Sequence, residues 1–188
     1  MNQVMILCGS RKPAPNVDRP SSSRELLRAV YAGLDDEGCP ATTLDLRKLE
    51  IPQFDGRDCA DYGVAGLEEV RKQITQAQVL LVSVPAYWNC ASGPLVNFFN
   101  VIAGASYDQD PDRPPPLDGV IALLVTVGAD DASAYHGASQ MRGMLSAMGA
   151  WVAPREVVVG NPRSQRNLGK VIAELRELGR YAATVCWH

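Results

Sequence analysis

Residues 79–100 of this chain are Val79-Leu-Leu-Val-Ser-Val-Pro-Ala-Tyr-Trp-Asn-Cys-Ala-Ser-Gly-Pro-Leu-Val-Asn-Phe-Phe-Asn100. The run Val79–Val84 is apolar and rich in β-branched side chains, which is typical of a strand buried on both faces of a parallel sheet. Pro85 is expected to end this strand, because proline cannot donate to a sheet ladder. Ser92 is expected to cap a helix with Pro94 in its first turn. The stretch therefore predicts a strand, a loop with two aromatic residues, and a helix.

The rest of the chain repeats this alternation of short apolar runs and amphipathic segments. Strands are expected at Val4–Cys8, Thr42–Leu46, Val120–Val127 and Trp151–Val159, the last interrupted by Pro154. Helices are expected at Ser22–Leu34, Val64–Ala77, His136–Met148 and Gln165–Val185. Such an alternation implies a parallel sheet with helices on both faces. The expected architecture is a doubly wound α/β fold of five strands in the order 2-1-3-4-5, forming a single domain over residues 1–188.

Two segments lack a regular pattern. Ile51–Gly63 contains a proline, two glycines and several aspartates, so a loop is expected. Gly104–Asp118 contains four prolines and four aspartates and is longer than most connections. This second segment is either a lid or partner-contacting loop, or a mobile surface loop.

Composition bounds the class of function. Lys plus Arg is 18 and Asp plus Glu is 21, a net charge of -3 that gives no support to nucleic-acid binding. No apolar run is long enough to cross a bilayer, and no signal peptide is expected because Met1 leads directly into the first strand. The five cysteines and two histidines show no metal-ligand spacing, so no metal site is expected. Reduced thiols in a cytoplasmic protein are the simplest account of these scattered cysteines.

The loop after Val4–Cys8 favours an anion site. It begins with Gly9-Ser10-Arg11 and ends with Ser21-Ser22-Ser23 at the start of the expected helix. A helix N-terminus offers unpaired amides and a partial positive charge, and the hydroxyls and Arg11 add to both. The alternative is that Ser21 and Ser22 only cap the helix. The loop contains neither G-x-x-x-x-G-K nor G-x-G-x-x-G, which argues against a nucleoside triphosphate or Rossmann dinucleotide site.

Two further loops favour a flat ligand. Pro85-Ala86-Tyr87-Trp88-Asn89 holds two adjacent aromatic rings, and the loop Thr126–Gly137 contains Gly128 and Ala129, whose backbone can approach a ring edge closely. In the order 2-1-3-4-5, strands one, three and four are neighbours, so all three loops share one crevice. The sequence thus predicts a phosphate at one end of a crevice and a flat ring at the other. The polar residues of this loop are candidates for contacts to a substrate, but turn and capping roles are the stronger expectation for them: Asp130, Asp131, Tyr135 and His136.

These motifs together resemble the NADPH-dependent FMN reductase family over nearly the whole chain. The resemblance rests on Gly9-Ser10-Arg11 with the serines that follow, on Pro85–Asn89 followed by Ser92-Gly-Pro-Leu-Val-Asn97, and on Val127-Gly128 followed by Leu145–Pro154. It implies a flavodoxin-like fold and bound FMN. Two features depart from the family pattern. Val96 replaces the usual lysine of Leu-Lys-Asn, and Pro13–Pro20 is an apparent insertion in the first loop.

The resemblance also implies a role for each loop. Ser10, Arg11 and one or more of Ser21, Ser22 and Ser23 would hold the FMN phosphate. Pro85, Ala86, Tyr87, Trp88 and Asn89 would contact the isoalloxazine ring, and Gly128 and Ala129 its pyrimidine side. FMN is expected rather than FAD, because the chain lacks G-x-G-x-x-G and leaves little room for an adenosine half.

The implied activity is that of an NAD(P)H-dependent FMN reductase or quinone-type oxidoreductase. Hydride would pass from NADPH or NADH through FMN to a flavin, quinone, azo compound or similar acceptor. No catalytic side chain is assigned, because the cofactor carries the chemistry. Two other functions are compatible with the sequence: a non-enzymatic FMN electron carrier, and a family member that has lost flavin and acts as a binding subunit. The mild net charge disfavours the carrier, and so do the basic residues Arg11, Lys12, Arg19 and Arg24.

The chain is expected to form a homodimer or homotetramer. Phe98 and Phe99 are adjacent in the helix that starts near Ser92. Neighbouring helical residues point about 100° apart, so both are not expected to face one core. One of the two rings, together with the loop around Tyr107, would then line a subunit contact.

Overall fold

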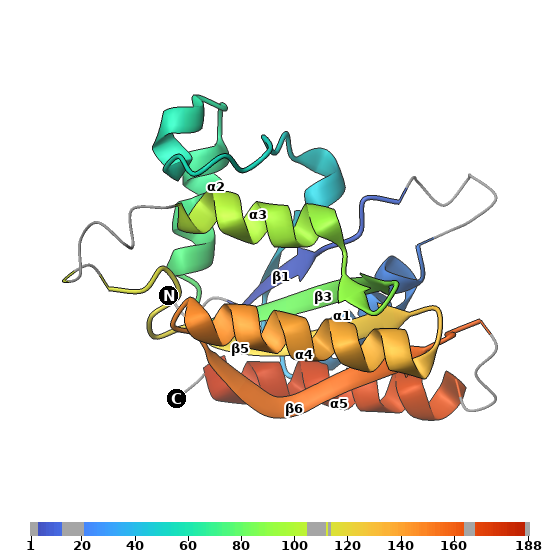
Figure 1. Cartoon of the computed structure of the whole chain (residues 1–188). Helices are drawn as coiled ribbons and strands as arrows, with labels where there is room; N and C mark the ends of the chain where they lie inside the picture. Colours follow the sequence, from blue (N-terminus) through green and yellow to red (C-terminus); the bar gives the residue numbers. More distant parts are fainter. Residues whose placement is uncertain (1–3, 13–20, 105–111, 113, 164–167, 187–188) are drawn as a thin grey trace.

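The computed structural model describes residues 4–12, 21–104, 112, 114–163 and 168–186. A parallel sheet runs through its middle in the strand order β2-β1-β3-β5-β6, with β4 paired to β3 beside this path (Figure 1). This is the predicted order 2-1-3-4-5, because β4 was not predicted and shifts the later numbers by one. The strands are β1 Val4–Cys8, β2 Ala41–Asp45, β3 Val79–Tyr87, β4 Cys90–Ala91, β5 Ile121–Gly128 and β6 Trp151–Gly160.

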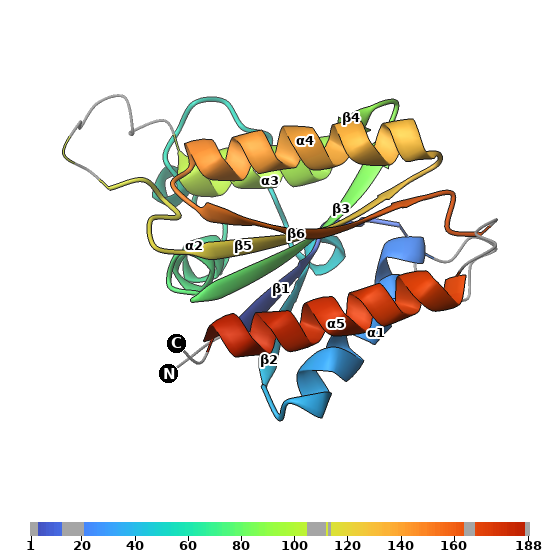
Figure 2. The same ribbon diagram turned by 90° about the horizontal axis from the view of Figure 1, so that it is seen from below.

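Helices cover the sheet on both sides, as Figure 2 shows with the sheet nearly edge-on. The α-helices are α1 Ser22–Asp36, α2 Leu67–Thr75, α3 Gly93–Ala103, α4 Asp131–Ala147 and α5 Leu168–Cys186, and short 3-10 turns occupy Leu46–Lys48 and Cys59–Tyr62. Helices α1 and α5 lie on one face, and α3 and α4 lie on the other. The predicted helix start at 165–167, the insertion Pro13–Pro20 and most of the loop Gly104–Asp118 lie outside the described residues.

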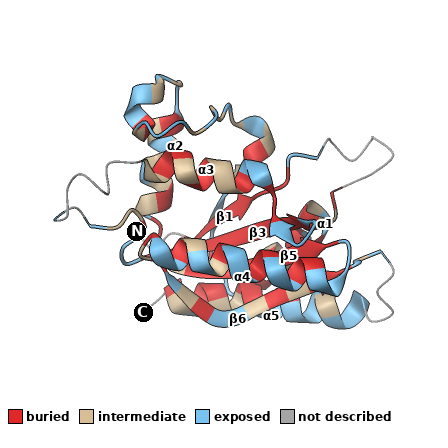
Figure 3. Cartoon of the chain, in the orientation of Figure 1, coloured by how far each residue is buried: buried red, intermediate tan, exposed pale blue. Residues whose placement is uncertain are grey.

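Alternate residues of the central strands feed two cores, one on each face of the sheet. In β3, Val79 and Leu81 pack with α1 and α5, whereas Leu80 and Val82 pack with α3 and α4. The same residues are fully buried, and Figure 3 shows the buried colour along the strands between the helices. Burial on both faces explains why these strands are continuous apolar runs.

Pro85 does not end β3, contrary to the sequence prediction. The strand continues to Tyr87, and Pro85 is paired in register with Val127 of β5. The carbonyl of Ser83 accepts a hydrogen bond from Gly9 at 3.0 Å on the β1 side, and residues two apart in a strand face the same way. The missing N–H of Pro85 therefore faces a side where β1 has already ended at Cys8, so no ladder bond is lost.

The predicted loop Pro85–Asn89 is instead a tight hairpin. Tyr87 pairs with Cys90 and Ala86 with Ala91, which leaves Trp88 and Asn89 as the two turn residues. Their φ angles are 52° and 60°, the left-handed values that a two-residue hairpin turn of type I′ requires. Asparagine tolerates this conformation but tryptophan rarely adopts it, so the sequence carries little hairpin signal here.

The helix after β5 begins five residues earlier than predicted. Asp130 caps α4 by accepting a hydrogen bond from the Ser133 amide at 2.7 Å, which lowers the pKa of the Asp130 carboxyl. Gly137, predicted to end a loop, lies inside α4, where a Cβ atom would come within 2.6 Å of the Ala86 side chain. The glycine lets α4 approach β3 closely. The predicted capping role of Asp130 is confirmed.

Phe98 and Phe99 are both fully buried in the same core, which corrects the inference that one of them lines a subunit contact. Their ring centroids are 5.5 Å apart, at an interplanar angle of 64°. Both are covered because α3 is packed on more than one side. Asn97 binds the segment at 52–54, donating to the Pro52 carbonyl at 2.8 Å and accepting from the Phe54 amide at 2.9 Å. This segment and α2 lie over α3 (Figure 1).

Helices α1 and α5 pack backbone to backbone. A Cβ atom added at Gly33 would overlap the Arg176 carbonyl, and one added at Gly179 would overlap the Val30 carbonyl. Asp36 at the end of α1 accepts hydrogen bonds from the guanidinium groups of Arg176 and Arg180. These bonds, chiefly the one from Arg176, lower the pKa of Asp36 to about 2.

Strand β6 forms one edge of the sheet. Its register with β5 shifts between the pairs Ala122–Val152 and Leu124–Glu156, at the position of Pro154, as the predicted interruption requires. Arg155 in this irregular part lies over the ring of Tyr181 at 5.2 Å. Within the described residues, none of the helices combines the length and the apolar character needed to cross a membrane.

Candidate functional site

A cavity of about 250 Å³ lies at the carboxyl ends of the central strands, where open α/β sheets bind ligands. Three predicted loops meet in it, together with the segment that follows β6. Its lining residues are Ser10, Lys12, Ser21, Ser22, Ser23, Pro85, Ala86, Tyr87, Val127, Gly128, Ala129, Asn161, Pro162 and Arg163. The serines gather at the α1 end of this set, and the ends of β3 and β5 with the segment after β6 form most of the rest.

The serine end is built on the N-terminus of α1. Ser21 occupies the N-cap position, yet its side chain makes no capping bond to the helix. Instead its hydroxyl donates to the Ser10 hydroxyl at 2.9 Å, and both residues are buried. The first helical hydrogen bonds run from the amides of Arg24 and Glu25 to the Ser21 carbonyl, so the amides of Ser22 and Ser23 precede them and have no carbonyl partner inside the helix. A buried hydroxyl pair therefore stands beside a helix end with free donor capacity and a partial positive charge.

Arg24 holds the first loop in place. Its guanidinium donates to both carboxyl oxygens of Asp45, at 2.6 and 3.1 Å, and to the Ser10 carbonyl. Burial alone would raise the pKa of Asp45, but the bonds from Arg24 and from the Arg47 amide outweigh it and lower that pKa. The charge of Arg24 is thus neutralised by Asp45. Arg24 does not line the cavity, but its bond to the Ser10 carbonyl fixes the position of Ser10.

The other end of the cavity is formed by two parallel strands as they end. Pro85, Ala86 and Tyr87 come from β3, and Val127 and Gly128 come from β5. Tyr87 is 42% exposed, and the Lys12 ammonium lies 5.6 Å from its ring centroid. A Cβ atom at Gly128 would come within 2.6 Å of the Ala134 nitrogen, so only glycine lets the strand end pass this close to α4. The result is a rigid wall that combines backbone edges with one aromatic face.

Most of the predicted site residues come together in this cavity. Nine of them line it, namely Ser10, Ser21, Ser22, Ser23, Pro85, Ala86, Tyr87, Gly128 and Ala129. Arg11, Trp88 and Asn89 do not. Trp88 is 95% exposed at the hairpin tip, and the Asn89 side chain accepts a bond from the Ser133 hydroxyl at 3.1 Å. The Asn89 contact ties the hairpin to the start of α4.

Sequence reasoning missed the contribution of β6. Asn161, Pro162 and Arg163 follow this strand and line the cavity. The amide of Asn161 donates to the Gly128 carbonyl at 3.0 Å, and Asn161 has a left-handed φ of 44°. The signal in the sequence was the run Gly160-Asn-Pro-Arg163, turn residues followed by a cation at the end of a strand. Lys12 and Val127 were also missed.

A second cavity of about 290 Å³ adjoins the first. Ser10, Lys12, Pro85 and Tyr87 line both, so Tyr87 stands between them. Arg11 lies in this second cavity together with Ser92, Gly93 and Pro94 at the start of α3. Two cations, Arg11 and Lys12, therefore face the space next to the aromatic wall.

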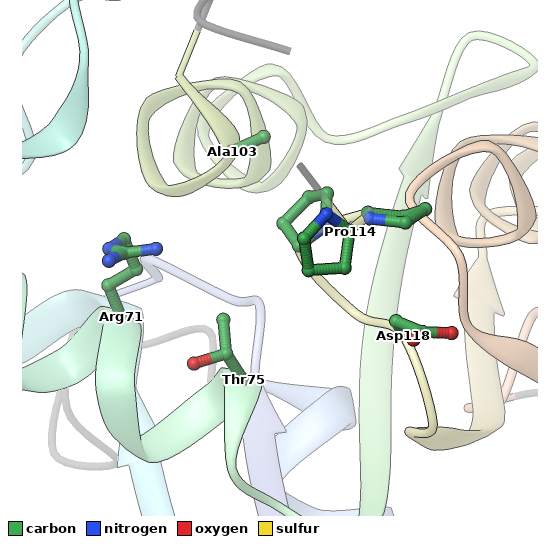
Figure 4. Close-up of a pocket in the computed structure, with 7 residues that line it drawn as sticks. Arg71, Thr75, Ala103, Pro114 and Asp118 are labelled. Carbon is green, nitrogen blue, oxygen red and sulfur yellow. The ribbon is translucent and has the colours of Figure 1, made fainter. Parts of the chain in front are cut away.

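A further cavity, of about 430 Å³, lies elsewhere (Figure 4). It is lined by Arg71, Thr75, Ala103, Asp118 and the prolines 114–116. Arg71 and Thr75 lie in α2 before β3, Ala103 ends α3, and residues 114–118 precede β5, so this cavity is at the amino ends of the strands. None of the predicted site residues lines it, and Arg71 is ion-paired with Glu68 at 2.8 Å. Among the described residues, no cluster of His, Cys, Asp and Glu fits a metal ion.

Known structures share this fold over the full length of the chain. An apo NADH:FMN oxidoreductase gives a TM-score of 0.66 at 20% identity, covering 97% of this chain and 88% of that one. An azoreductase from Bacillus anthracis str. Sterne gives 0.69 at 17% identity, covering 98% and 100%. A flavodoxin from the domain Archaea gives 0.61 at 10% identity, covering 99% of each chain. At these identities the likeness establishes a flavodoxin-like fold.

Comparison at the level of sequence assigns the family. No curated protein matches the chain at a significant level. The family model described as NADPH-dependent FMN reductase matches residues 2–164, which include the first loop, the hairpin and the ends of β5 and β6. That match spans most of the 188 residues, and the chain belongs to the NADPH-dependent FMN reductase family.

Proposed function

We propose that this protein binds FMN in the cavity at the carboxyl ends of β1, β3 and β5 and works as an NAD(P)H-dependent oxidoreductase. The observation that carries the proposal is the Ser10–Ser21 hydroxyl pair, which leaves the first-turn amides of α1 without a side-chain cap beside an aromatic wall. A phosphate at one end and a flat ring at the other match this arrangement. Membership of an FMN reductase family supports the same assignment.

Each end of the cavity has a distinct task. Ser10, Ser21, Ser22, Ser23 and Arg163 would bind the phosphate. Pro85, Ala86, Tyr87, Gly128 and Ala129 would orient the ring and exclude water from one side of it. Bound FMN supplies the hydride-transfer chemistry, and the residues of the chain supply position and electrostatics. No carboxylate, imidazole or thiol lines this part of the described chain, which fits a reaction without a protein acid or base.

The adjoining cavity suits an anionic second substrate. Arg11 and Lys12 place two positive charges there, and Tyr87 separates this space from the proposed ring site. A reduced nicotinamide nucleotide brings phosphates to such charges and a flat ring to the flavin. The acceptor, a small flavin, quinone or azo compound, would enter by the same opening once the nicotinamide leaves. We further propose a cytoplasmic protein that forms a homodimer or homotetramer.

Anaerobic and aerobic assays on the purified protein test this function. FMN should bind with a calorimetric signal at micromolar concentration, and NADPH or NADH oxidation should depend on FMN. If FMN binds but nicotinamide is not oxidised, the protein is an electron carrier. If FMN does not bind at all, the site assignment is wrong, and a binding role without flavin becomes the better explanation.

A further inference from the structure

Two of the five cysteines, Cys39 and Cys186, lie side by side although they come from distant parts of the chain. All five cysteines are free thiols. The thiols of Cys39 and Cys186 hydrogen-bond to each other, and both belong to the core between the sheet and the helices α1 and α5. The other three lie elsewhere, Cys8 in β1, Cys59 in a 3-10 turn and Cys90 in the hairpin.

The turn that ends α1 holds Cys39 in place. Gly38 has a left-handed φ of 61°, and its amide donates to the Asp35 carbonyl at 3.0 Å. The amide of Cys39 donates to the Leu34 carbonyl, also at 3.0 Å. This pair of bonds around a left-handed glycine is the Schellman arrangement, which fixes the backbone just after a helix. Cys39 therefore has a defined position below the end of α1.

Cys186 reaches this turn because of the way α5 packs on α1, its neighbour in Figure 2. The backbones of the two helices touch at Gly33 and Gly179. Cys186 follows Gly179 by about two helical turns, so it lies on the same buried face of α5. It is also the last residue of that helix, and its thiol donates to the Gln78 side chain at 3.6 Å. The end of α5 is thus brought onto the turn that contains Cys39.

The two thiols differ in how readily they react. Burial raises the pKa of both. The contact with Cys186 offsets part of this rise for Cys39, whereas the contact with Cys39 adds to the rise for Cys186. Cys39 is also the more exposed of the two, at 6% against 1%. Because the thiolate is the reactive form of cysteine, Cys39 is the first of the pair to meet an oxidant.

We propose that Cys39 and Cys186 form an intramolecular disulfide when the protein is exposed to hydrogen peroxide. The Cys39 thiolate attacks one peroxide oxygen, the O–O bond breaks, and hydroxide leaves, which gives a sulfenic acid at Cys39. The Cys186 sulfur then attacks the Cys39 sulfur, the S–O bond breaks, and water leaves with the Cys186 proton. With the proton that Cys39 lost, two thiols and one peroxide give one disulfide and two water molecules. The new bond ties the end of α5 to the turn after α1.

Peptide mapping by mass spectrometry tests the proposal. The purified protein is treated with hydrogen peroxide and then unfolded in the presence of an alkylating reagent. The wild type should give a bridged peptide that contains Cys39 and Cys186, with Cys8, Cys59 and Cys90 alkylated. Cys39→Ala and Cys186→Ala should each lack the bridge. Cys90→Ala, which removes the exposed cysteine, is the control and should keep it.

Thermal melting measures what the bond does to the protein. The oxidised wild type should melt roughly 5–10 °C above the reduced protein, because the bond constrains the unfolded chain over most of its length. Dithiothreitol should remove this difference. An unchanged melting temperature in the bridged protein would overturn the stabilising role of the bond.

The mapping result on the wild type decides the proposal even if an alanine variant fails to fold. A wild type without the bridge overturns it, and so does a bridge in which another cysteine replaces either member of the pair. None of these measurements involves a flavin, so their outcome is independent of the proposed FMN site.

Discussion

Ser21 stands where a capping residue is expected, but its hydroxyl hydrogen-bonds to Ser10 and not to the helix. From the sequence, Ser21 could either cap the helix or face a ligand, since serine is common at N-caps. Three-dimensional placement decides between them, because Ser10 is eleven residues away in sequence, just after the end of β1. The sequence cannot distinguish a capping serine from one that faces a ligand until Ser10 is placed beside the start of α1.

Removing the hydroxyl pair should therefore affect a phosphorylated flavin selectively. In the double variant Ser10→Ala/Ser21→Ala, FMN affinity should fall by about 1.5–3 kcal/mol, the usual contribution of a hydrogen bond to a charged group. Riboflavin, which lacks the phosphate, should bind as before, as measured by calorimetry. Ser146→Ala, at an exposed position near the end of α4, is the control. Equal losses for both ligands would mean that the pair only stabilises the loop.

Tyr87 and Trp88 are adjacent but differ in their surroundings. Tyr87 lines both cavities, whereas Trp88 projects from the hairpin turn. Tyr87→Ala should weaken FMN by about 1 kcal/mol, as expected for one aromatic contact.

Trp88→Ala should leave FMN affinity nearly unchanged, because Trp88 lines neither cavity, and should alter the Michaelis constant of the acceptor if the acceptor reaches the hairpin tip beside Tyr87. Fluorescence titration and steady-state kinetics on both variants check the two roles. Loss of FMN binding in Trp88→Ala but not in Tyr87→Ala would reverse them, and no effect of either change would remove the hairpin from the site.

At the level of elements, the sequence predicted the strands well and their ends poorly. Burial on both faces makes β1, β3 and β5 apolar runs, a pattern that does not depend on their neighbours. The end of β3 depends on where β1 stops, since only then is Pro85 tolerated inside a strand. The start of α4 depends on the capping bond of Asp130. In the sequence, an aspartate that caps a helix cannot be told from an aspartate in a turn. The end of β3 and the start of α4 both lie next to the ligand cavity. The element boundaries that are hardest to predict from the sequence are therefore the ones beside the cavity.

The contact between α1 and α5 gives the protein an acid-sensitive element. The folded pKa of Asp36 is about 2, below its ordinary 3.8, so its ion pairs with Arg176 and Arg180 contribute stability above pH 4. This stability is lost as the pH falls from about 4 through 2. Asp36→Asn should lower the melting temperature at pH 7, and the difference from wild type should vanish near pH 2.

Calorimetric melting between pH 2 and 7 measures this difference. Asp35→Asn, at an exposed neighbouring position of the same helix, is the matched control and should melt like the wild type. A difference for Asp36→Asn that stays constant down to pH 2 would mean that the ion pairs are not its cause.

For the whole molecule, the predicted strand order was confirmed because few topologies satisfy an alternation of strands and helices. The order brought strands one, three and four together and so placed the three loops. The last strand, β6, was left out of the predicted site, and with it Asn161 and Arg163. Its contribution depends on the Asn161–Gly128 bond, which folds the segment after β6 toward the cavity. No periodicity in the sequence reports such a bend.

Because Phe98 and Phe99 are buried, the prediction of an oligomer must rest on another surface. Trp88 at the hairpin tip is 95% exposed and Tyr135 in the first turns of α4 is 64% exposed, and the Asn89–Ser133 bond joins these two elements. Two exposed aromatic residues on joined elements favour a subunit contact. Light scattering should give a dimer or tetramer mass for the wild type. Trp88→Ala/Tyr135→Ala should reduce it, whereas Trp151→Ala on β6 should not. A monomer at all concentrations would contradict the prediction.

The irregular edge of β6 should make the protein less prone to aggregate in concentrated solution. An exposed edge strand is a template on which strands of other molecules can add, and such addition leads to aggregation. Around Pro154 this edge lacks a backbone donor and shifts its register, and the neighbouring Arg155 carries a charge. Foreign strands therefore cannot pair along its full length. Pro154→Val would restore a regular donor there, and concentrated solutions of that variant should form sheet-rich precipitates that the native protein resists.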